Sequence, residues 1–520
     1  MIKYTLLFAT LVLLFSCGPR EFEPPAEVKE VLELAGDNRT ELEKVITHYK
    51  EEGNVIKEEA AYCLLGNMKN HGYLEYKLVD SAGNNVDFNV LDYSDYEHLL
   101  DGWDEIEDNR GKIHFEKDTF YNDYNEITAG YLIKNIDLAY KAWDENPWAQ
   151  HLDFDQFCEY ILPYRSSNEP IEEWREYFIK ELSWVKDSVK NPSDPIEAAC
   201  FVNDYIKSWF RFDPRYYEHP TDQGLQEMLN VKLGRCEDMT NLAIYAMRAM
   251  GIPVMSDFTP YWANTGNNHA WNAIIGKDGK TVIFMGGEAN PGEYELGHKL
   301  AKVYRKTFAI QHASLPEKME KWDKAPPYLN SNSIRDVTDE YVPAQRVKIE
   351  LTKGIPDSTQ FSYLCVFNSG EWKAIDYTRF YGTKATYSKV GLGVAYLPAF
   401  YYDNEIVPAA DAFLLNDTLT IDNKTPNGND RIALTLYSTT KRITKETTDF
   451  IEHAEFNKGK TYILYFWHDK WEEAGRKVAG EGPLIFNSVP SDAIYWLVED
   501  GSRKEERIFT IDENGKQIWW

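Results

Sequence analysis

The chain has 520 residues, of which 43% are hydrophobic and 27% charged, and its formal net charge is −28. Its length suits about three or four domains, because one hydrophobic core rarely grows beyond about 250–300 residues. The acidic balance argues against nucleic acid as a partner, since no basic excess is available to neutralise phosphates. It also disfavours adsorption to anionic membrane surfaces.

The first residues have the pattern of an export signal. Lys3 is followed by an apolar run from Tyr4 to Phe15, which is too short to span a bilayer comfortably. The sequence LLFSC, ending at Cys17, resembles a bacterial lipobox. The resemblance implies cleavage before Cys17 and lipidation of its thiol; the alternative is an ordinary signal peptide with a chance cysteine. Lipidation would anchor an exported protein to a membrane, which we expect to be the outer membrane, on its periplasmic or cell-surface face.

Helical patterns dominate the next part of the chain. Apolar residues recur at helical spacing over 24–75 and over 135–210, with short strands and acidic turns between them. Five cysteines remain after Cys17, and Cys63 and Cys200 lie in apolar helical patterns where core packing is expected. The sequence has no CxxC pair, so it indicates neither a cysteine-based zinc site nor any other cofactor.

Beyond about residue 340 the pattern changes to alternating strands with Gly, Asn and Asp turns. Six residues recur at a constant offset of 99: Tyr363, Phe367, Trp372, Tyr387, Val390 and Tyr396 reappear as Tyr462, Phe466, Trp471, Phe486, Val489 and Tyr495. The repeat predicts two tandem β-sandwich-like modules whose aromatic residues fill their own cores. The alternative is that Trp372, Trp471, Trp519 and Trp520 stack on sugar rings and bind glycan.

Cys236 stands where a helix should begin, in GRCEDMTNLAIYAMRAMGIPV. Gly234 allows a sharp turn before the helix, and Glu237 and Asp238 favour a helix start. The helix dipole and unpaired amides of a first turn lower the pKa of a thiol and can stabilise an oxyanion. The two neighbouring acids oppose this effect. Cys236 is therefore a candidate nucleophile, with a buried core cysteine as the alternative.

A thiol nucleophile usually needs a histidine, and His269 begins the probable strand NHAWNAII. The Asp278-Gly279 pair predicts a two-residue hairpin turn to the next strand, TVIFMGG. In that register Glu288 faces His269 across the ladder, where a carboxylate could orient the imidazole. A slip of one residue would place Glu288 on the opposite face.

The cysteine helix and the NHAW strand together resemble the transglutaminase-like (papain-like) cysteine superfamily. The shared pattern is a Gly-x-Cys helix start, the helix end RAMGIP, and His-x-Trp at a strand start, over roughly residues 195–310. The resemblance implies Cys236 as nucleophile and His269 as base, with Trp271 at the family's aromatic position. The whole layout is similar to bacterial transglutaminase-like lipoproteins.

The sequence departs from the family where an Asp usually ends the second strand, since TVIFMGGEANP has none. Glu288 substitutes for it in our interpretation, and Asn290 is the alternative, acting as the amide does in papain-like enzymes. Asn230 and Gln226 precede Cys236 at a plausible distance for an oxyanion side chain. Further cleft candidates are Tyr261 and Trp262, on the loop that leads to His269.

These observations predict an α+β multidomain protein with a papain- or transglutaminase-like core between a helical region and the β-modules. The predicted boundaries are a signal peptide with lipobox at 1–17, a mainly helical region at 18–150, the cysteine core at 151–335, and the modules at 336–440 and 441–520. The expected activity is hydrolysis of peptide or amide bonds, in a peptide, protein or peptidoglycan-like substrate, through an acyl-thioester on Cys236. The alternatives are transfer of the acyl group to an amine, and a non-catalytic lipoprotein that captures glycan or protein through its β-modules.

Overall fold

The structure is a computed structural model, and it describes residues 23–320, 323–440, 455–502, 504 and 506–520. The predicted signal peptide and the lipidation site at Cys17 lie outside the described residues, as does the start of the predicted second module. Within the described ranges, no helix combines the length and apolar character needed to cross a bilayer.

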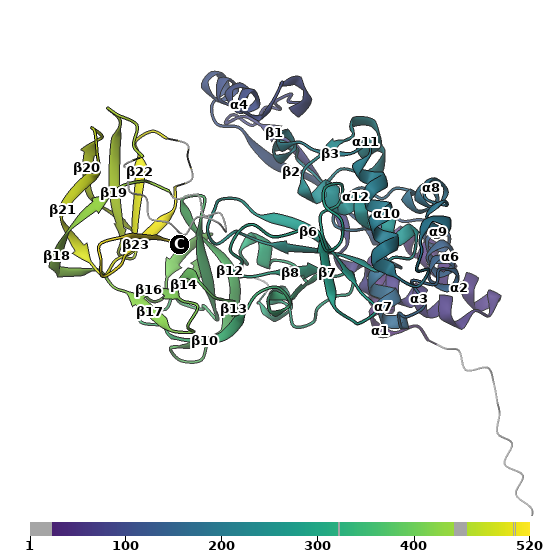
Figure 1. Cartoon of the computed structure of the whole chain (residues 1–520). Helices are drawn as coiled ribbons and strands as arrows, with labels where there is room; N and C mark the ends of the chain where they lie inside the picture. Colours follow the sequence, from purple (N-terminus) through teal and green to yellow (C-terminus); the bar gives the residue numbers. More distant parts are fainter. Residues whose placement is uncertain (1–22, 321–322, 441–454, 503, 505) are drawn as a thin grey trace, which may run out of the picture.

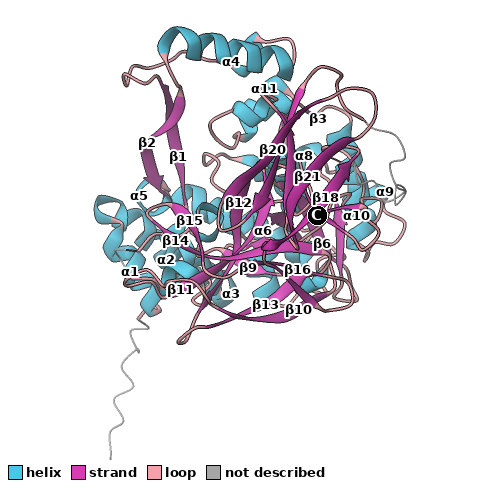
Figure 2. Cartoon of the chain, turned by 90° about the vertical axis from the view of Figure 1, so that its left-hand side faces the viewer, coloured by secondary structure: helices cyan, strands magenta, loops and turns pink. Residues whose placement is uncertain are grey.

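The predicted α+β class is confirmed, with helices in the N-terminal half and antiparallel sheets in the C-terminal half (Figures 1 and 2). Apart from α4 (Tyr96–Arg110), the α-helices that precede α10 (Pro195–Lys207) in the chain are α1 (Ala26–Leu34), α2 (Arg39–Glu52), α3 (Val55–Asn67), α5 (Asp123–Glu126), α6 (Ala129–Glu145), α7 (Phe154–Tyr160), α8 (Trp174–Glu181) and α9 (Val185–Ser188). Their apolar faces share one hydrophobic cluster with the core helices, and this cluster extends from Val28 to Val337.

An arm formed by residues 72–122 projects from this helical body (Figure 1). It consists of the antiparallel strands β1 (Gly72–Val79) and β2 (His114–Asn122), with helix α4 (Tyr96–Arg110) at its far end. Val90 and Leu99 of the arm bury against Tyr216. Tyr216 belongs to η4 (Pro214–Glu218), a short helix of the core, so the arm is attached beside the cysteine helix.

The cysteine core packs helix α12 (Cys236–Ala249) against a five-stranded antiparallel sheet of order β7-β6-β5-β8-β9. Its strands are β5 (Val254–Thr259), β6 (His269–Ile275), β7 (Thr281–Phe284), β8 (Tyr304–Lys306) and β9 (Ile334–Asp336). Helices α10 (Pro195–Lys207) and α11 (Leu225–Val231) flank α12, and a short parallel pair, β3 (Arg211–Phe212) with β4 (Leu233–Gly234), leads into it. A small helix, α13 (Leu315–Lys318), follows β8.

The predicted repeat appears as two sets of sheets with the same strand order. The first set contains a two-stranded sheet, β10 (Ala344–Glu350) with β13 (Lys384–Gly391), and a larger sheet in which the strand order is β12-β11-β14-β16-β17 and β15 pairs with β14. The strands of the larger sheet are β11 (Phe361–Asn368), β12 (Glu371–Arg379), β14 (Val394–Tyr402), β15 (Glu405–Pro408), β16 (Ala412–Leu415) and β17 (Ile421–Lys424). The second set contains a two-stranded sheet, β18 (Asn427–Leu436) with β21 (Leu484–Ser491), and a five-stranded sheet in the order β20-β19-β22-β23-β24. The strands of the five-stranded sheet are β19 (Thr461–Trp467), β20 (Trp471–Val478), β22 (Tyr495–Glu499), β23 (Ile508–Ile511) and β24 (Gln517–Trp519).

One tyrosine hydrogen bond is duplicated at the same offset of 99 residues. Tyr396 donates to the carbonyl oxygen of Gly391 at 2.7 Å, and Tyr495 donates to that of Pro490 at 2.6 Å. A buried hydroxyl needs such a partner, and in each repeat the equivalent tyrosine finds it in the backbone oxygen of the residue five positions earlier.

The tryptophans considered for sugar stacking pack inside the protein. Trp372 is 5% exposed, and Trp471 lies edge-on to Phe367 in the same hydrophobic cluster. Trp519 and Trp520 are half-buried, and each indole N–H donates to a hydroxyl or carbonyl oxygen of the second set of sheets. These contacts favour core packing for all four residues.

Candidate active site

Close packing at Gly234 fixes the turn that brings Cys236 to the start of α12. A Cβ atom on Gly234 would lie 2.7 Å from Asp238 Cβ, 2.8 Å from Gln223 Nε2 and 2.9 Å from Phe210 Cζ. The Asp238 carboxylate accepts a hydrogen bond from the backbone N–H of Arg235 at 2.9 Å, which satisfies a donor at the helix start.

The Cys236 sulfur lies beside the first residues of β6. The backbone N–H of Ala270, the residue after His269, acts to lower the pKa of the thiol. The thiol in turn donates to Glu237 Oε2 at 3.5 Å. Burial raises the pKa of Cys236 well above its ordinary value, and the Glu237 charge raises it further. The thiol is therefore neutral at neutral pH.

The His269 ring lies against three aromatic side chains, those of Trp262, Trp271 and Tyr294. Its Nε2 and the Tyr294 hydroxyl are 2.6 Å apart, and the Trp262 ring stacks on it at a centroid distance of 5.7 Å. Burial, followed by the charge of His298, lowers the pKa of His269 to about 4. The imidazole is therefore unprotonated at neutral pH and is able to accept a proton.

The predicted pairing of His269 with Glu288 is wrong, because the hairpin register differs by one residue. Ile275 pairs with Thr281, and the ladder ends at Phe284. Three residues, 277–279, form the loop instead of two, and Gly279 takes a φ of +76°, as in hairpins that end in a G1 bulge. Glu288 lies in a turn after the strand and does not face His269 across the sheet.

The two residues predicted as the third catalytic group, Glu288 and Asn290, therefore do not lie opposite His269 in the sheet. Glu288 is exposed, and its charge is the second cause, after burial, of the raised pKa of Tyr294, so the two groups lie near each other. The Asn290 amide is engaged by α10, where it accepts from Asn203 Nδ2 and donates to Asp204 Oδ1, both at 3.0 Å. The group hydrogen-bonded to His269 Nε2 is Tyr294, a loop residue with no sequence pattern that marks it.

The remaining cleft candidates divide into two groups. Trp262 contacts His269 directly, and Tyr261 packs edge-on to Tyr328 at 5.2 Å. Trp271 is completely buried and donates to the Tyr341 hydroxyl at 3.1 Å, so its role is structural. Asn230 is an exposed residue of α11 whose side chain contacts Gln226 at 3.4 Å.

Three tyrosines lie within electrostatic range of the sulfur, and none of them was predicted as a site residue. Tyr217, Tyr294 and Tyr328 each have a raised pKa, mainly through burial, and the charge of Cys236 contributes in every case. Tyr328 also binds the Asn268 side chain, directly before His269. Tyr217 lies in η4, Tyr328 in the short helix η5 (Pro327–Leu329) and Tyr294 in a loop, and no local spacing in the sequence brings these segments together.

The β-modules hold the loop that leads to His269. Asn368 Nδ2 donates to the backbone oxygens of Trp262, Thr265 and Asn267 at 3.0, 2.8 and 2.9 Å. Arg507, from the second set of sheets, donates to the oxygen of Ala263 at 2.6 Å. The position of the imidazole therefore depends on residues about a hundred or more positions later in the chain.

Residues 174–284 match the family model of the Transglutaminase-like superfamily, so the chain contains a transglutaminase-like domain that includes Cys236 and His269. A candidate cysteine protease from Cytophaga hutchinsonii is similar in structure, at 14% identity and a TM-score of 0.17, over 31% of this chain and 57% of that one. This chain thus spans little more than half of that protein. Red sea bream transglutaminase is similar at 10% identity and a TM-score of 0.20, over 86% of this chain and 77% of that one. No curated protein matches the sequence.

Proposed function

We propose that the chain is a thiol enzyme that hydrolyses peptide or amide bonds through an acyl-thioester on Cys236. The observation that carries the proposal is the position of Tyr294 near both groups: its hydroxyl lies 2.6 Å from His269 Nε2, and the charge of Cys236 contributes to its raised pKa. This arrangement puts a nucleophile and a base at adjacent points of one site.

The reaction follows from the protonation states. His269 accepts the thiol proton as the sulfur attacks the amide carbonyl, and backbone N–H groups at the start of α12 stabilise the oxyanion. The imidazolium then gives that proton to the departing amine, which leaves an acyl-thioester. A water molecule, deprotonated by His269, attacks the thioester and releases the acid while the proton returns to the sulfur.

Substrate entry requires a local movement. Cys236 is 3% exposed, so an amide carbonyl cannot reach the sulfur in the conformation described. Tyr294 lies in a loop, and Tyr217 and Tyr328 lie in short helices that are flanked by loops; such loops move on the timescales of substrate binding. Opening of these loops would uncover the sulfur without disturbing α12.

A peptide library tests the proposal. The full chain should release new amine termini from library peptides, and Cys236→Ala should abolish this activity, whereas Cys200→Ala, a matched control in the same core, should not. A labelled primary amine added to the assay distinguishes hydrolysis from transfer, because transfer would incorporate the label. Equal activity of the parent and Cys236→Ala would refute the thiol mechanism.

We propose further that the protein is an exported lipoprotein, anchored to the outer membrane through Cys17. The support is the LLFSC sequence after a short apolar run. In a Gram-negative host, Cys17→Ala should abolish incorporation of radiolabelled palmitate and release the protein from the membrane fraction. Palmitate incorporation that persists in Cys17→Ala would contradict this proposal.

A further inference from the structure

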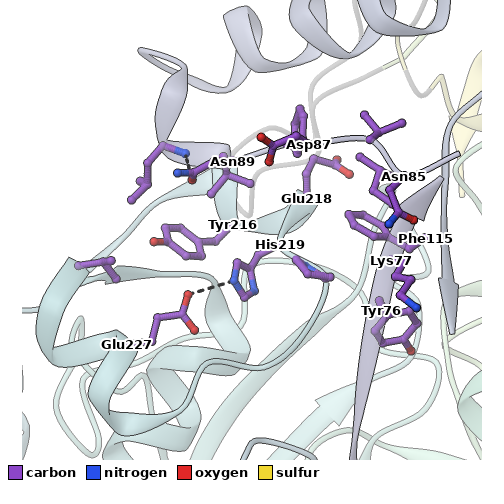
Figure 3. A pocket seen from close by; sticks show the side chains of 17 residues that line it. Tyr76, Lys77, Asn85, Asp87, Asn89, Phe115, Tyr216, Glu218, His219 and Glu227 are labelled. Atoms are coloured by element: carbon purple, nitrogen blue, oxygen red, sulfur yellow. Dashed lines mark hydrogen bonds and ion pairs between the residues drawn. The ribbon is translucent and has the colours of Figure 1, made fainter. Parts of the chain in front are cut away.

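A pocket of about 680 Å³ lies between the arm and the cysteine core (Figure 3). One wall comes from β1, β2 and the loop 85–91 of the arm, and the other from η4, the residues that follow it, and α11. The pocket contains apolar surface from Phe88 and Phe115, together with several charged side chains, and the buried Tyr216 lies behind it. Its volume falls in the range of about 300–1,000 Å³ that is typical of ligand sites.

The charges in the pocket leave two carboxylates without a cation. Lys77 pairs with Asp118, and His219 pairs with Glu227 at 3.1 Å. Glu218 accepts a hydrogen bond from the Tyr96 hydroxyl at 3.1 Å. Within the part of the chain that the structure describes, neither Asp87 nor Glu218 has a basic partner. The pocket therefore presents a net negative charge above an apolar surface.

The short helix η4 links this pocket to Cys236. Tyr216 and Glu218 line the pocket, whereas Tyr217 between them has a pKa raised by burial and then by the charge of Cys236. Arg235, directly before Cys236, donates to the backbone oxygen of His219 at 3.0 Å. Residues of one short segment thus contact the pocket on one side and the thiol site on the other.

We infer that this pocket binds a lysine or arginine side chain of a polypeptide substrate. The apolar stem of such a side chain packs on Phe88 and Phe115, and its charged head meets Asp87 and Glu218. The inference rests on the proposed function only in calling the ligand a substrate, because binding itself needs no catalysis. It assigns a preference for basic residues of the substrate to a pocket in which two carboxylates, Asp87 and Glu218, have no basic partner among the described residues.

The test uses the full chain with Cys236→Ala, so that binding is measured without turnover. Fluorescence anisotropy follows a fluorescein-labelled decapeptide with two lysines, and the same peptide with both lysines replaced by glutamine. The pocket variant is Asp87→Asn with Glu218→Gln. The matched control, Asp101→Asn with Glu105→Gln, removes two exposed charges from α4 of the same arm.

We expect the lysine peptide to bind more tightly than the glutamine peptide, and the pocket variant to weaken its binding about five- to tenfold. The control variant should leave the Kd unchanged. Equal losses in both variants would show attraction to the acidic surface in general and would overturn the inference, as would equal affinity for the two peptides. Asp87→Asn alone, which breaks no contact in the described structure, should give a smaller loss in the same direction.

The two proposals fail in distinguishable ways. Tight, lysine-dependent binding by a protein that hydrolyses no peptide would support the inferred pocket and refute the proposed hydrolase activity. Hydrolysis that shows no preference for lysine or arginine, and that is unchanged in the pocket variant, would support the hydrolase activity and refute the inferred pocket.

Discussion

At the scale of single residues, opposing effects set the state of Cys236. The first turn of α12 and the Ala270 N–H stabilise a thiolate, whereas burial and the Glu237 carboxylate destabilise it. Burial is the largest of these effects, so the resting sulfur is a neutral thiol. The pKa of His269, at about 4, favours the neutral imidazole. Both shifts favour the neutral pair, in which the proton stays on the sulfur of the resting site.

The charge of Glu237 provides a direct test of this balance. Glu237→Gln removes a negative charge next to the sulfur, so the pKa of Cys236 should fall. The alkylation rate of Cys236 by iodoacetamide should then rise several-fold at pH 8, and its pH profile should move to lower pH. Glu97→Gln, on the exposed side of α4, is the control. An unchanged profile would show that Glu237 has no influence on the thiol.

Tyr294 is a positioning residue for His269, because its hydroxyl bonds Nε2 and its ring lies beside the imidazole. Tyr294→Phe removes one hydrogen bond, worth about 1 kcal/mol, so kcat should fall about five- to tenfold with little change in KM. The pH profile of kcat should also shift. Tyr261→Phe, which leaves that bond intact, should keep parental kcat. Parental kcat in Tyr294→Phe would assign the orienting role to another group.

At the scale of elements, the sequence predicted the helix and strand that carry the thiol and the imidazole. GRCEDM and RAMGIP marked the two ends of α12, because glycine and acidic residues have strong local preferences. The partner of His269 was not predictable in the same way. One extra loop residue changed the hairpin register, and Tyr294 reaches the ring from an irregular segment. Local patterns thus identify elements, whereas contacts between loops depend on tertiary packing.

The end of α12 requires glycine for two reasons. Gly251 has a φ of +69°, and a Cβ there would overlap the backbone oxygen of Ala142. Gly279 in the hairpin has a φ of +76° but open space around it. Gly279→Ala should therefore cost only the backbone strain, about 1–2 kcal/mol. Gly251→Ala should cost about 2–4 kcal/mol in the free energy of unfolding by urea, since overpacking adds to the strain. Equal costs would show that the overlap relaxes freely.

At the scale of the whole molecule, three parts of the chain meet at the thiol site. The N-terminal helices share their core with α12, the arm adjoins η4, and both sets of C-terminal sheets bind the loop before His269. The 99-residue repeat was visible in the sequence because aromatic core positions are regularly spaced. Its contact with the active-site loop was not, since that contact depends on single polar side chains such as Asn368.

Asn368 tests whether the β-modules support the site. Asn368→Ala removes three hydrogen bonds from the loop 262–267, so the loop should exchange its amide hydrogens faster and kcat should fall about tenfold or more through misplacement of His269. Asn416→Ala, which removes turn hydrogen bonds in the same module, should leave both quantities unchanged. An unchanged rate of amide hydrogen exchange in the loop and an unchanged kcat in Asn368→Ala would show that the β-modules do not position His269.

The most direct measurement of the central claim is the site of covalent labelling in the native protein. A peptide carrying a thiol-directed electrophile is reacted with the full chain, and the modified residue is identified by mass spectrometry. We predict modification at Cys236, loss of labelling in Cys236→Ala, and at least tenfold slower labelling in His269→Gln. Modification of another cysteine while Cys236 stays unreacted, or an unchanged rate in His269→Gln, would contradict a Cys236–His269 catalytic pair.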